Sequence, residues 1–156
     1  MTEMVTIPLA DAIQVHYDGL ARDELLITRC TACDRHQFPP RAVCYGCSSA
    51  GTLEWVRAEG AGEVWSFVTF HKAYFAPEVR TVPYDVAVVE LDEGPRIITS
   101  LSGLEDDEVG VGLRVQAGYW HHSDQHLVTF HPTATPTSPR RPTPLAPAEG
   151  EHDVTH

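Results

Sequence analysis

The sequence predicts a mainly β protein with an N-terminal helix, a four-cysteine zinc ribbon and a five-stranded OB-fold barrel. Two Cys-x-x-Cys pairs separated by ten residues predict the ribbon. Short β-branched and aromatic runs follow one another closely from residue 60 onward, with no long helical pattern between them, and predict the barrel. We therefore expect a helical segment at 1–24, the ribbon at 25–59, the barrel at 60–131 and a proline-rich tail at 132–156.

The first segment carries apolar side chains at helical spacing. Leu9, Ile13, Tyr17 and Leu20 recur every three or four residues, and Gly19 suits the end of a helix. The apolar stripe needs a surface to cover, either the core of this chain or a partner subunit. His16, on the same segment, is expected at the surface.

The two cysteine pairs predict a structural metal site. Cys30 and Cys33 form the first pair, and Cys44 and Cys47 form the second. Four thiolates from two tight turns can surround one tetrahedral Zn²⁺, with metal–sulfur bonds of about 2.3 Å. Such a site has no open coordination position, which indicates a structural rather than a catalytic role. Zinc is the expected metal, and iron is the less favoured one because rubredoxin-type sites also use four thiolates.

Other uses of these cysteines are disfavoured. Two disulfides would suit an oxidising compartment, but the chain begins without an apolar secretory segment. A redox-active Cys-x-x-Cys would be expected within a βαβ pattern, and no such pattern surrounds either pair. His36 lies between the pairs and is also disfavoured as a ligand, since four cysteines are available.

Eight strands are expected in total. Apolar or alternating runs at 25–29, 36–38 and 53–57 predict the ribbon strands. The barrel strands are predicted at 64–70, 84–91, 96–101, 114–120 and 127–130. Gly94 and Pro95 suit a tight hairpin connection between the second and third barrel strands.

The connection from residue 71 to 83 is longer than a small barrel requires. It mixes aromatic and cationic side chains, which either form a binding surface or fold back to cap the barrel. The relevant residues are His71, Lys72, Tyr74, Phe75, Pro77 and Arg80. No recognised catalytic motif places a carboxylate or a nucleophile at a fixed spacing from His71, so we do not assign His71 a catalytic role.

Composition and motifs reduce the number of function classes that fit the sequence. The formal net charge is −11, which would repel the phosphate backbone of nucleic acid. No apolar run approaches the roughly 18 residues of a membrane span, so we expect a cytoplasmic protein without membrane insertion. The motifs of α/β-hydrolases, P-loop proteins and dinucleotide-binding enzymes are missing from the sequence, which lowers the odds of an independent enzyme. The proline-rich tail cannot build a core of its own.

Several motifs in combination resemble one known family. They are Leu25 to Cys33, Phe38-Pro39-Pro40-Arg41, Cys44-x-x-Cys47, Leu53-Glu54-Trp55, Pro83-Tyr84 and Val88 to Pro95. Together they resemble the acyl-CoA-associated family with a rubredoxin-like zinc ribbon and an OB-fold, also called domain of unknown function thirty-five. The resemblance spans roughly residues 17–132.

The resemblance implies a non-catalytic accessory subunit of a thiolase-fold enzyme that acts on CoA thioesters. Partners in this family include thiolases, acyltransferases and the aldolases of steroid side-chain degradation. It implies a complex with two copies of each chain, in which acyl-CoA lies at the shared interface. The candidates for facing the partner or CoA are Phe38, Pro39, Pro40, Arg41, His71, Lys72, Tyr74, Phe75, Arg80 and Tyr84.

Two other functions remain open. An OB-fold that binds single-stranded nucleic acid could use the aromatic strand from Trp65 to Phe70 as a stacking platform, although the net charge opposes this. An independent acyl-CoA hydrolase or hydratase could use His71 and Asp85. Turnover of acyl-CoA by the isolated chain would support this second alternative.

Overall fold

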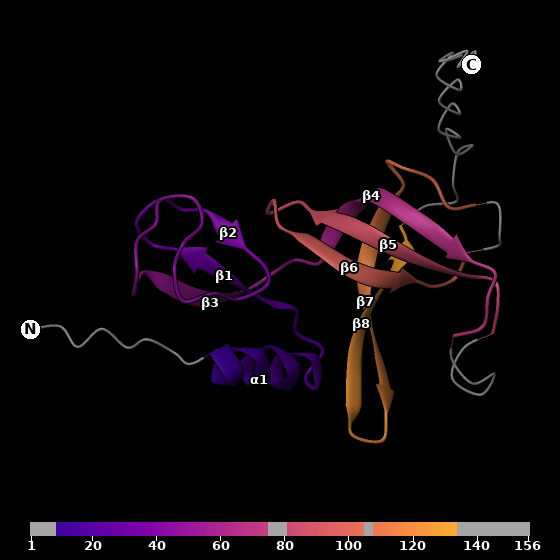
Figure 1. Ribbon diagram of the computed structural model, residues 1–156, viewed down its shortest axis with the longest axis horizontal. Coiled ribbons are helices and arrows are strands. Elements are labelled where there is room, and N and C mark those ends of the chain that lie inside the picture. Colours follow the sequence, from indigo (N-terminus) through magenta and orange to yellow (C-terminus); the bar gives the residue numbers. More distant parts are fainter. Residues whose placement is uncertain (1–8, 75–80, 105–107, 134–156) are drawn as a thin grey trace, which may run out of the picture.

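The described part of the chain consists of one helix, a three-stranded sheet and a closed five-stranded barrel (Figure 1). This computed structural model describes residues 9–74, 81–104 and 108–133. The elements are α1 (Leu9–Leu20), β1 (Leu26–Cys30), β2 (His36–Gln37), β3 (Leu53–Arg57), β4 (Ala61–Phe70), β5 (Tyr84–Leu91), β6 (Arg96–Leu101), β7 (Arg114–His122) and β8 (Gln125–Pro132). The predicted fold class is confirmed. The division of the chain at residues 24, 59 and 131 stays a prediction.

The ribbon sheet has the order β2-β1-β3, and both pairings are antiparallel. Thr28 in the central strand is buried, and its hydroxyl donates a hydrogen bond to the backbone oxygen of Gln37 over 3.1 Å. β2 ends at Gln37, earlier than predicted, because prolines soon follow and have no backbone N–H to extend the pairing. So small a sheet needs support from outside its own hydrogen bonds.

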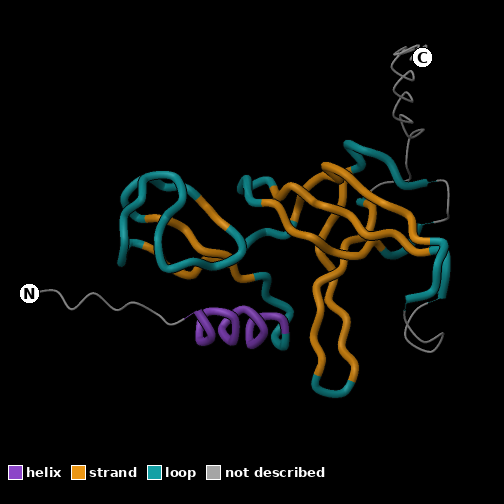
Figure 2. The backbone as a smooth tube through the Cα atoms, viewed as in Figure 1, coloured by secondary structure: helices purple, strands orange, loops and turns teal. Residues whose placement is uncertain are grey.

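The barrel has the order β4-β5-β6-β8-β7 and closes by pairing β4 with β7. Only β6 and β8 run parallel, while the other neighbours are antiparallel. This is the Greek-key barrel of the OB-fold type. The hairpin of β7 and β8 is longer than predicted and extends past the barrel wall toward α1 (Figure 2). We call this extension, from Tyr119 to Val128, the β7–β8 hairpin.

One hydrophobic core joins the three parts. The barrel contributes fully buried Val64, Val89 and Phe130. Leu20 from the end of α1 and Ile27 from β1 belong to the same buried cluster. The helix, the ribbon and the barrel are therefore packed against one another by the hydrophobic effect rather than joined only by the chain.

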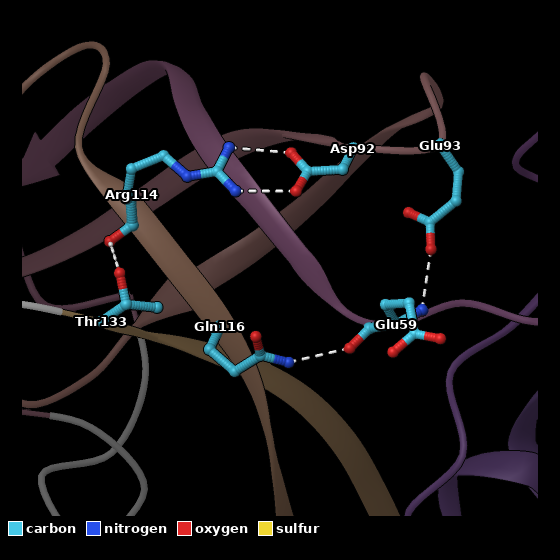
Figure 3. A network of polar contacts seen from close by, with 6 residues as sticks. All are labelled: Glu59, Asp92, Glu93, Arg114, Gln116 and Thr133. Carbon is cyan, nitrogen blue, oxygen red and sulfur yellow. Dashed lines mark hydrogen bonds and ion pairs between the residues drawn. The ribbon is translucent and has the colours of Figure 1, made fainter.

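A polar network holds the connection between ribbon and barrel (Figure 3). Arg114 on β7 binds Asp92 with two parallel contacts of 2.8 and 2.7 Å, and this hydrogen-bonded guanidinium lowers the pKa of Asp92. Glu59 donates its backbone N–H to Glu93 over 2.7 Å, and its carbonyl accepts from Gln116 over 2.8 Å. The network therefore joins residues just before β4 to the β5–β6 turn and to β7.

Helix α1 packs closely on the ribbon. A Cβ atom at Gly19 would lie 2.8 Å from the Leu26 side chain, so only glycine allows this approach. His16 is half-buried, and its Nδ1–H donates to the backbone oxygen of Leu26 over 3.1 Å. Its ring also lies 5.0 Å from that of Phe38. The expectation that His16 lies at the surface was therefore wrong, because the close helix–strand contact turns its ring inward.

None of the helices in the described part of the chain is both long enough and apolar enough to cross a membrane.

We predict that acid loosens α1. Burial lowers the pKa of His16 below that of a free histidine. As the pH falls below about 6.5, the unfolded chain takes up a proton before the folded chain does, so stability is lost with acid. NMR signals of 9–20 should shift toward those of a detached helix in this pH range. His16→Gln keeps an N–H donor but does not titrate, and should remove this pH dependence. Equal pH dependence in both proteins would contradict the assignment to His16.

Candidate metal centre

Two tight turns of the same shape present the four cysteines. In the first turn, the backbone N–H of Asp34 donates to the oxygen of Cys30 over 2.8 Å, and in the second, Ser48 donates to Cys44 over 2.9 Å. Asp34 and Ser48 each follow a cysteine pair, and both have a positive φ of 61°. This left-handed residue reverses the chain directly after each pair. Each turn can therefore direct both of its sulfurs to the same side.

The four sulfur atoms form one compact cluster. All of them lie within 4.8 Å of one another. The Sγ atoms of Cys30 and Cys47 are 3.7 Å apart, and those of Cys33 and Cys44 are 3.6 Å apart. Sulfurs that surround a tetrahedral Zn²⁺ at about 2.3 Å are separated by about 3.8 Å. The predicted cysteines are thus brought together and positioned to bind a metal.

Neighbouring hydroxyl groups favour the thiolate form. Thr52 and Ser49 lie 3.3 and 3.5 Å from the sulfur of Cys30, and their hydrogen bonds lower its pKa to about 5. Ser49 lies 3.0 Å from the sulfur of Cys47 and lowers that pKa too. The backbone N–H of Gly46 donates to Cys44 over 3.3 Å. These donors would orient and stabilise metal-bound thiolates as outer-shell groups.

Cys33 behaves in the opposite way. The backbone N–H of Arg35 lowers its pKa, but burial and the surrounding thiols outweigh that contact and raise the pKa to about 12. Several thiolates cannot ionise side by side without a compensating charge. A divalent cation at the centre of the cluster supplies that charge, so metal binding and ionisation of Cys33 would occur together.

Ser49 and Thr52 were not singled out from the sequence. Their hydroxyls are 2.7 Å apart and form one hydrogen-bonded unit beside the sulfurs. The available signal was their position in the Ser48-Ser49-Ala50-Gly51-Thr52 stretch directly after the second cysteine pair. Small hydroxyl residues next to a metal ligand are typical outer-shell donors.

The remaining candidate residues fall into two separate groups. Phe38 and Arg41 line a groove of about 470 Å³ between the ribbon and the β5–β6 turn, together with Tyr45, Glu90 and Arg96. The Arg96 guanidinium stacks 3.9 Å from the ring centre of Trp65 and pairs with Glu90 over 2.7 Å. Pro39 is exposed, but Pro40 is buried and therefore does not present a surface to a partner.

The second group lies at the far end of β4. Phe70 stacks on Tyr84 with ring centres 5.2 Å apart, and it meets Tyr74 edge-on at 5.8 Å. Lys72 lies over the Tyr74 ring at 5.5 Å, and His71 is exposed beside it. Phe75 and Arg80 lie outside the described residues. The sequence-predicted surface is therefore divided between the two ends of the barrel.

Sequence reasoning missed a surface between α1 and the β7–β8 hairpin. A groove of about 570 Å³ separates them. Its lining residues are Gln14, Tyr17, Asp18, Ala21, Asp124, Gln125, His126 and Leu127. We call these residues, together with the exposed Ile13, the helix–hairpin surface. The exposed apolar side chains of α1 were readable from the sequence, whereas the position of the hairpin depends on the tertiary fold.

A zinc ribbon joined to an OB-fold barrel defines a recognised class of protein, and known families match both parts. A family model described as the ChsH2 rubredoxin-like zinc ribbon domain matches residues 18–54. A second, described as the ChsH2 C-terminal OB-fold domain, matches residues 55–119. The chain belongs to the DUF35 family, which is the family that the sequence motifs predicted.

Similar proteins carry names from this family. A DUF35 domain-containing scaffold protein of Methanothermobacter thermautotrophicus is 30% identical, over 61% of this chain and 71% of its own length. The 3-oxo-4,17-pregnadiene-20-carboxyl-CoA hydratase alpha subunit of Mycobacterium tuberculosis is 36% identical over 74% of this chain. A probable enoyl-CoA hydratase alpha subunit of Thermomonospora curvata also matches, and this chain spans only about a third of the length of either hydratase subunit. The solved structure of the Ltp2-ChsH2(DUF35) aldolase aligns with a TM-score of 0.70 and 30% identity, covering 78% of this chain and 94% of the other.

We predict that Cys33→Ser removes the metal and unfolds the ribbon. Three sulfurs leave a tetrahedral metal incompletely bound, and small metal-stapled units depend on the metal for folding. Elemental analysis should fall from about one metal per chain to well below that value. NMR signals of 26–57 should collapse while the barrel signals persist. His36→Ala is the matched control, because His36 lies between the cysteine pairs without belonging to the cluster. Full metal content in the Cys33 variant would contradict the four-cysteine assignment.

Proposed function

We propose that this chain is a non-catalytic accessory subunit that docks on a thiolase-fold enzyme acting on CoA thioesters, and that its cysteine site holds zinc. One observation carries the docking role: α1 leaves an apolar face uncovered. Ile13 and Tyr17 are 45% and 47% exposed, and they lie one turn apart on the same side of the helix. Ala12 and Leu20 are buried and hold the helix in place, so Ile13 and Tyr17 are not needed for its packing on this chain.

Only part of the apolar face of α1 is covered by this chain. A 12-residue helix depends on tertiary contacts, because isolated helices of this length are marginal in water. The β7–β8 hairpin adds Trp120 and Leu127, which are paired across the two strands and are 43% and 46% exposed. Exposed aromatic and aliphatic side chains of this kind are typical of the centre of a protein–protein interface.

The charge of the helix–hairpin surface indicates the chemistry of the partner. Asp18 and Asp124 line the groove, and no lysine or arginine is among the described residues that line it. With a net charge of −11, the chain would favour a partner that offers cations beside apolar side chains. We infer that the partner places an arginine or lysine next to Asp18 and Asp124, at the polar edge of this surface, while Tyr17 meets apolar side chains.

The comparisons support this role at the level of the family. One relative is named as a scaffold protein, and one solved neighbour is a DUF35 chain within an aldolase assembly. The name of the matching ribbon domain supports zinc as the metal. The hydratase relative is named for a steroid-derived CoA thioester, which supports the steroid side-chain class of substrate. We propose two copies of each chain, since thiolase-fold enzymes are commonly dimers.

We also propose that acyl-CoA lies at the interface with the enzyme. Arg41 and Arg96 in the ribbon–barrel groove are the cations suited to its phosphates. Lys72 and Tyr74 at the other end of the barrel form a second candidate contact. An independent hydrolase using His71 and Asp85 is less favoured, because the Asp85 carboxylate already accepts a hydrogen bond from Thr69.

We predict that Tyr17→Asp prevents assembly with the enzyme. A carboxylate at the centre of an apolar interface would lose its water without a partner, which should weaken binding by at least about tenfold. The measurement is co-purification of the tagged chain with a thiolase-fold enzyme of the same organism, with acyl-CoA turnover recorded on the same sample.

Ile98→Asp is the matched control. Ile98 is 77% exposed on β6 and lies outside the helix–hairpin surface, so this change should leave assembly intact. Assembly that survives Tyr17→Asp but fails with Ile98→Asp would contradict the docking surface. Partner activity that is unchanged when this chain is removed would overturn the accessory role itself.

A further inference from the structure

Two cysteines of the cluster are exposed, and they occupy matching positions in the two turns. Cys33 and Cys47 each end a cysteine pair, and the first cysteine of each pair is buried. Each exposed sulfur accepts a backbone N–H from the residue two positions further on, which is Arg35 in the first turn and Ser49 in the second. A reagent in solution can therefore reach two sulfurs whose local backbone is closely alike.

A side-chain hydroxyl distinguishes these two sulfurs. Oγ of Ser49 lies 3.0 Å from the sulfur of Cys47. The corresponding residue of the first turn is Arg35, which has no hydroxyl, and its guanidinium lies over the Tyr45 ring at 5.6 Å. Among the described residues, no side-chain hydroxyl or amide donates a hydrogen bond to Cys33. Cys33 is therefore the exposed sulfur with fewer hydrogen-bond donors.

Thr52 strengthens the donor at Cys47. A metal-bound thiolate has no proton of its own, so it can only accept hydrogen bonds. The Ser49 hydroxyl donates to Cys47 and accepts from the Thr52 hydroxyl, which is 2.7 Å away and shares its proton with Cys30 at 3.3 Å. Hydrogen bonds in such a chain polarise one another, so the contact with Cys47 is stronger than that of an isolated hydroxyl.

We propose that Cys33 is the peroxide-reactive residue of the cluster and that the Ser49 hydroxyl protects Cys47 from the same reaction. The thiolate is the nucleophilic form of cysteine. A charge-assisted hydrogen bond holds the electron pair that would form the new bond, so the reaction at Cys47 must first displace the Ser49 proton. Cys33 is equally accessible and lacks this protection. The proposal depends on the metal site and does not require the docking role.

Hydrogen peroxide is the two-electron oxidant in this reaction. The Cys33 thiolate forms a bond to one peroxide oxygen, the O–O bond breaks, and hydroxide leaves. The sulfur of Cys44 is buried 3.6 Å from that of Cys33 and attacks the resulting sulfenic acid. The S–S bond forms as the S–O bond breaks, and a second hydroxide leaves. Two thiolates have then lost two electrons, and the two that remain are too few for a four-coordinate site.

The experiment is limited oxidation of the zinc-loaded full chain, with its metal content measured by elemental analysis. After addition of hydrogen peroxide below one equivalent, the remaining thiols are blocked and peptides are mapped by mass spectrometry. The disulfide between Cys33 and Cys44 should be the first product, and zinc should appear in solution in proportion to it. Brief labelling of the zinc-loaded chain with N-ethylmaleimide should modify Cys33 at least about tenfold faster than Cys47, because one charge-assisted hydrogen bond must be displaced at Cys47.

Variants of Ser49 test the protecting hydroxyl. Ser49→Ala should raise the labelling rate of Cys47 to within about twofold of that of Cys33, because the two sulfurs then have similar donors. Ser49→Thr keeps a hydroxyl and should restore the difference. Ser48→Gly is the matched control, because the φ of 61° at Ser48 suits glycine and no described contact joins its hydroxyl to a sulfur. Equal rates at Cys33 and Cys47 in the unaltered chain, a first disulfide without Cys33, or a Cys47 rate that Ser49→Ala leaves unchanged would overturn the proposal.

Discussion

The four-thiolate cluster is the constraint on which the rest of the molecule depends. The ribbon sheet contains a two-residue strand, and its core is too small to hold three strands by apolar burial alone. A metal bound between the two cysteine turns would join β1 to the loop that precedes β3. β1 in turn carries Ile27 into the core that it shares with the barrel. Loss of the metal would therefore remove Ile27 from this core and loosen the packing of α1 on β1, while the closed barrel keeps its own strand pairing.

Helix α1 is positioned by that same strand. Gly19 and His16 both meet Leu26, one through close packing and the other through a hydrogen bond to its carbonyl. Asp23, just after the helix, reaches the β7–β8 hairpin through His121. The helix–hairpin surface thus exists because ribbon and barrel hold its two halves in place. We infer that the metal site maintains the proposed docking surface.

Much of this architecture was predictable because its signals are local in sequence. Cysteine spacing defines the cluster, and β-branched runs define the barrel strands within a few residues. The inward position of His16, the length of the β7–β8 hairpin and the pairing of His121 with His126 were not predictable in the same way. They depend on tertiary packing, such as the contact of His16 with Leu26 and the contact of Asp23 with His121, 98 residues further along the chain, for which the sequence contains no periodic signal. The hydroxyls of Ser49 and Thr52 are intermediate between locally predictable features and features that depend on tertiary packing. They are near the cysteines in sequence but contact the sulfurs only when the turns fold.

The central claim is that the chain acts through the face formed by α1 and the hairpin. The most direct measurement is hydrogen exchange, followed by mass spectrometry, on this chain alone and in complex with the proposed thiolase-fold enzyme. Burial in an interface slows exchange of backbone amides that otherwise open locally. The account predicts strong protection in the peptides spanning 9–20 and 119–128, with little change in 96–101. Protection restricted to the Phe70–Tyr84 end of the barrel, with α1 unchanged, would contradict it.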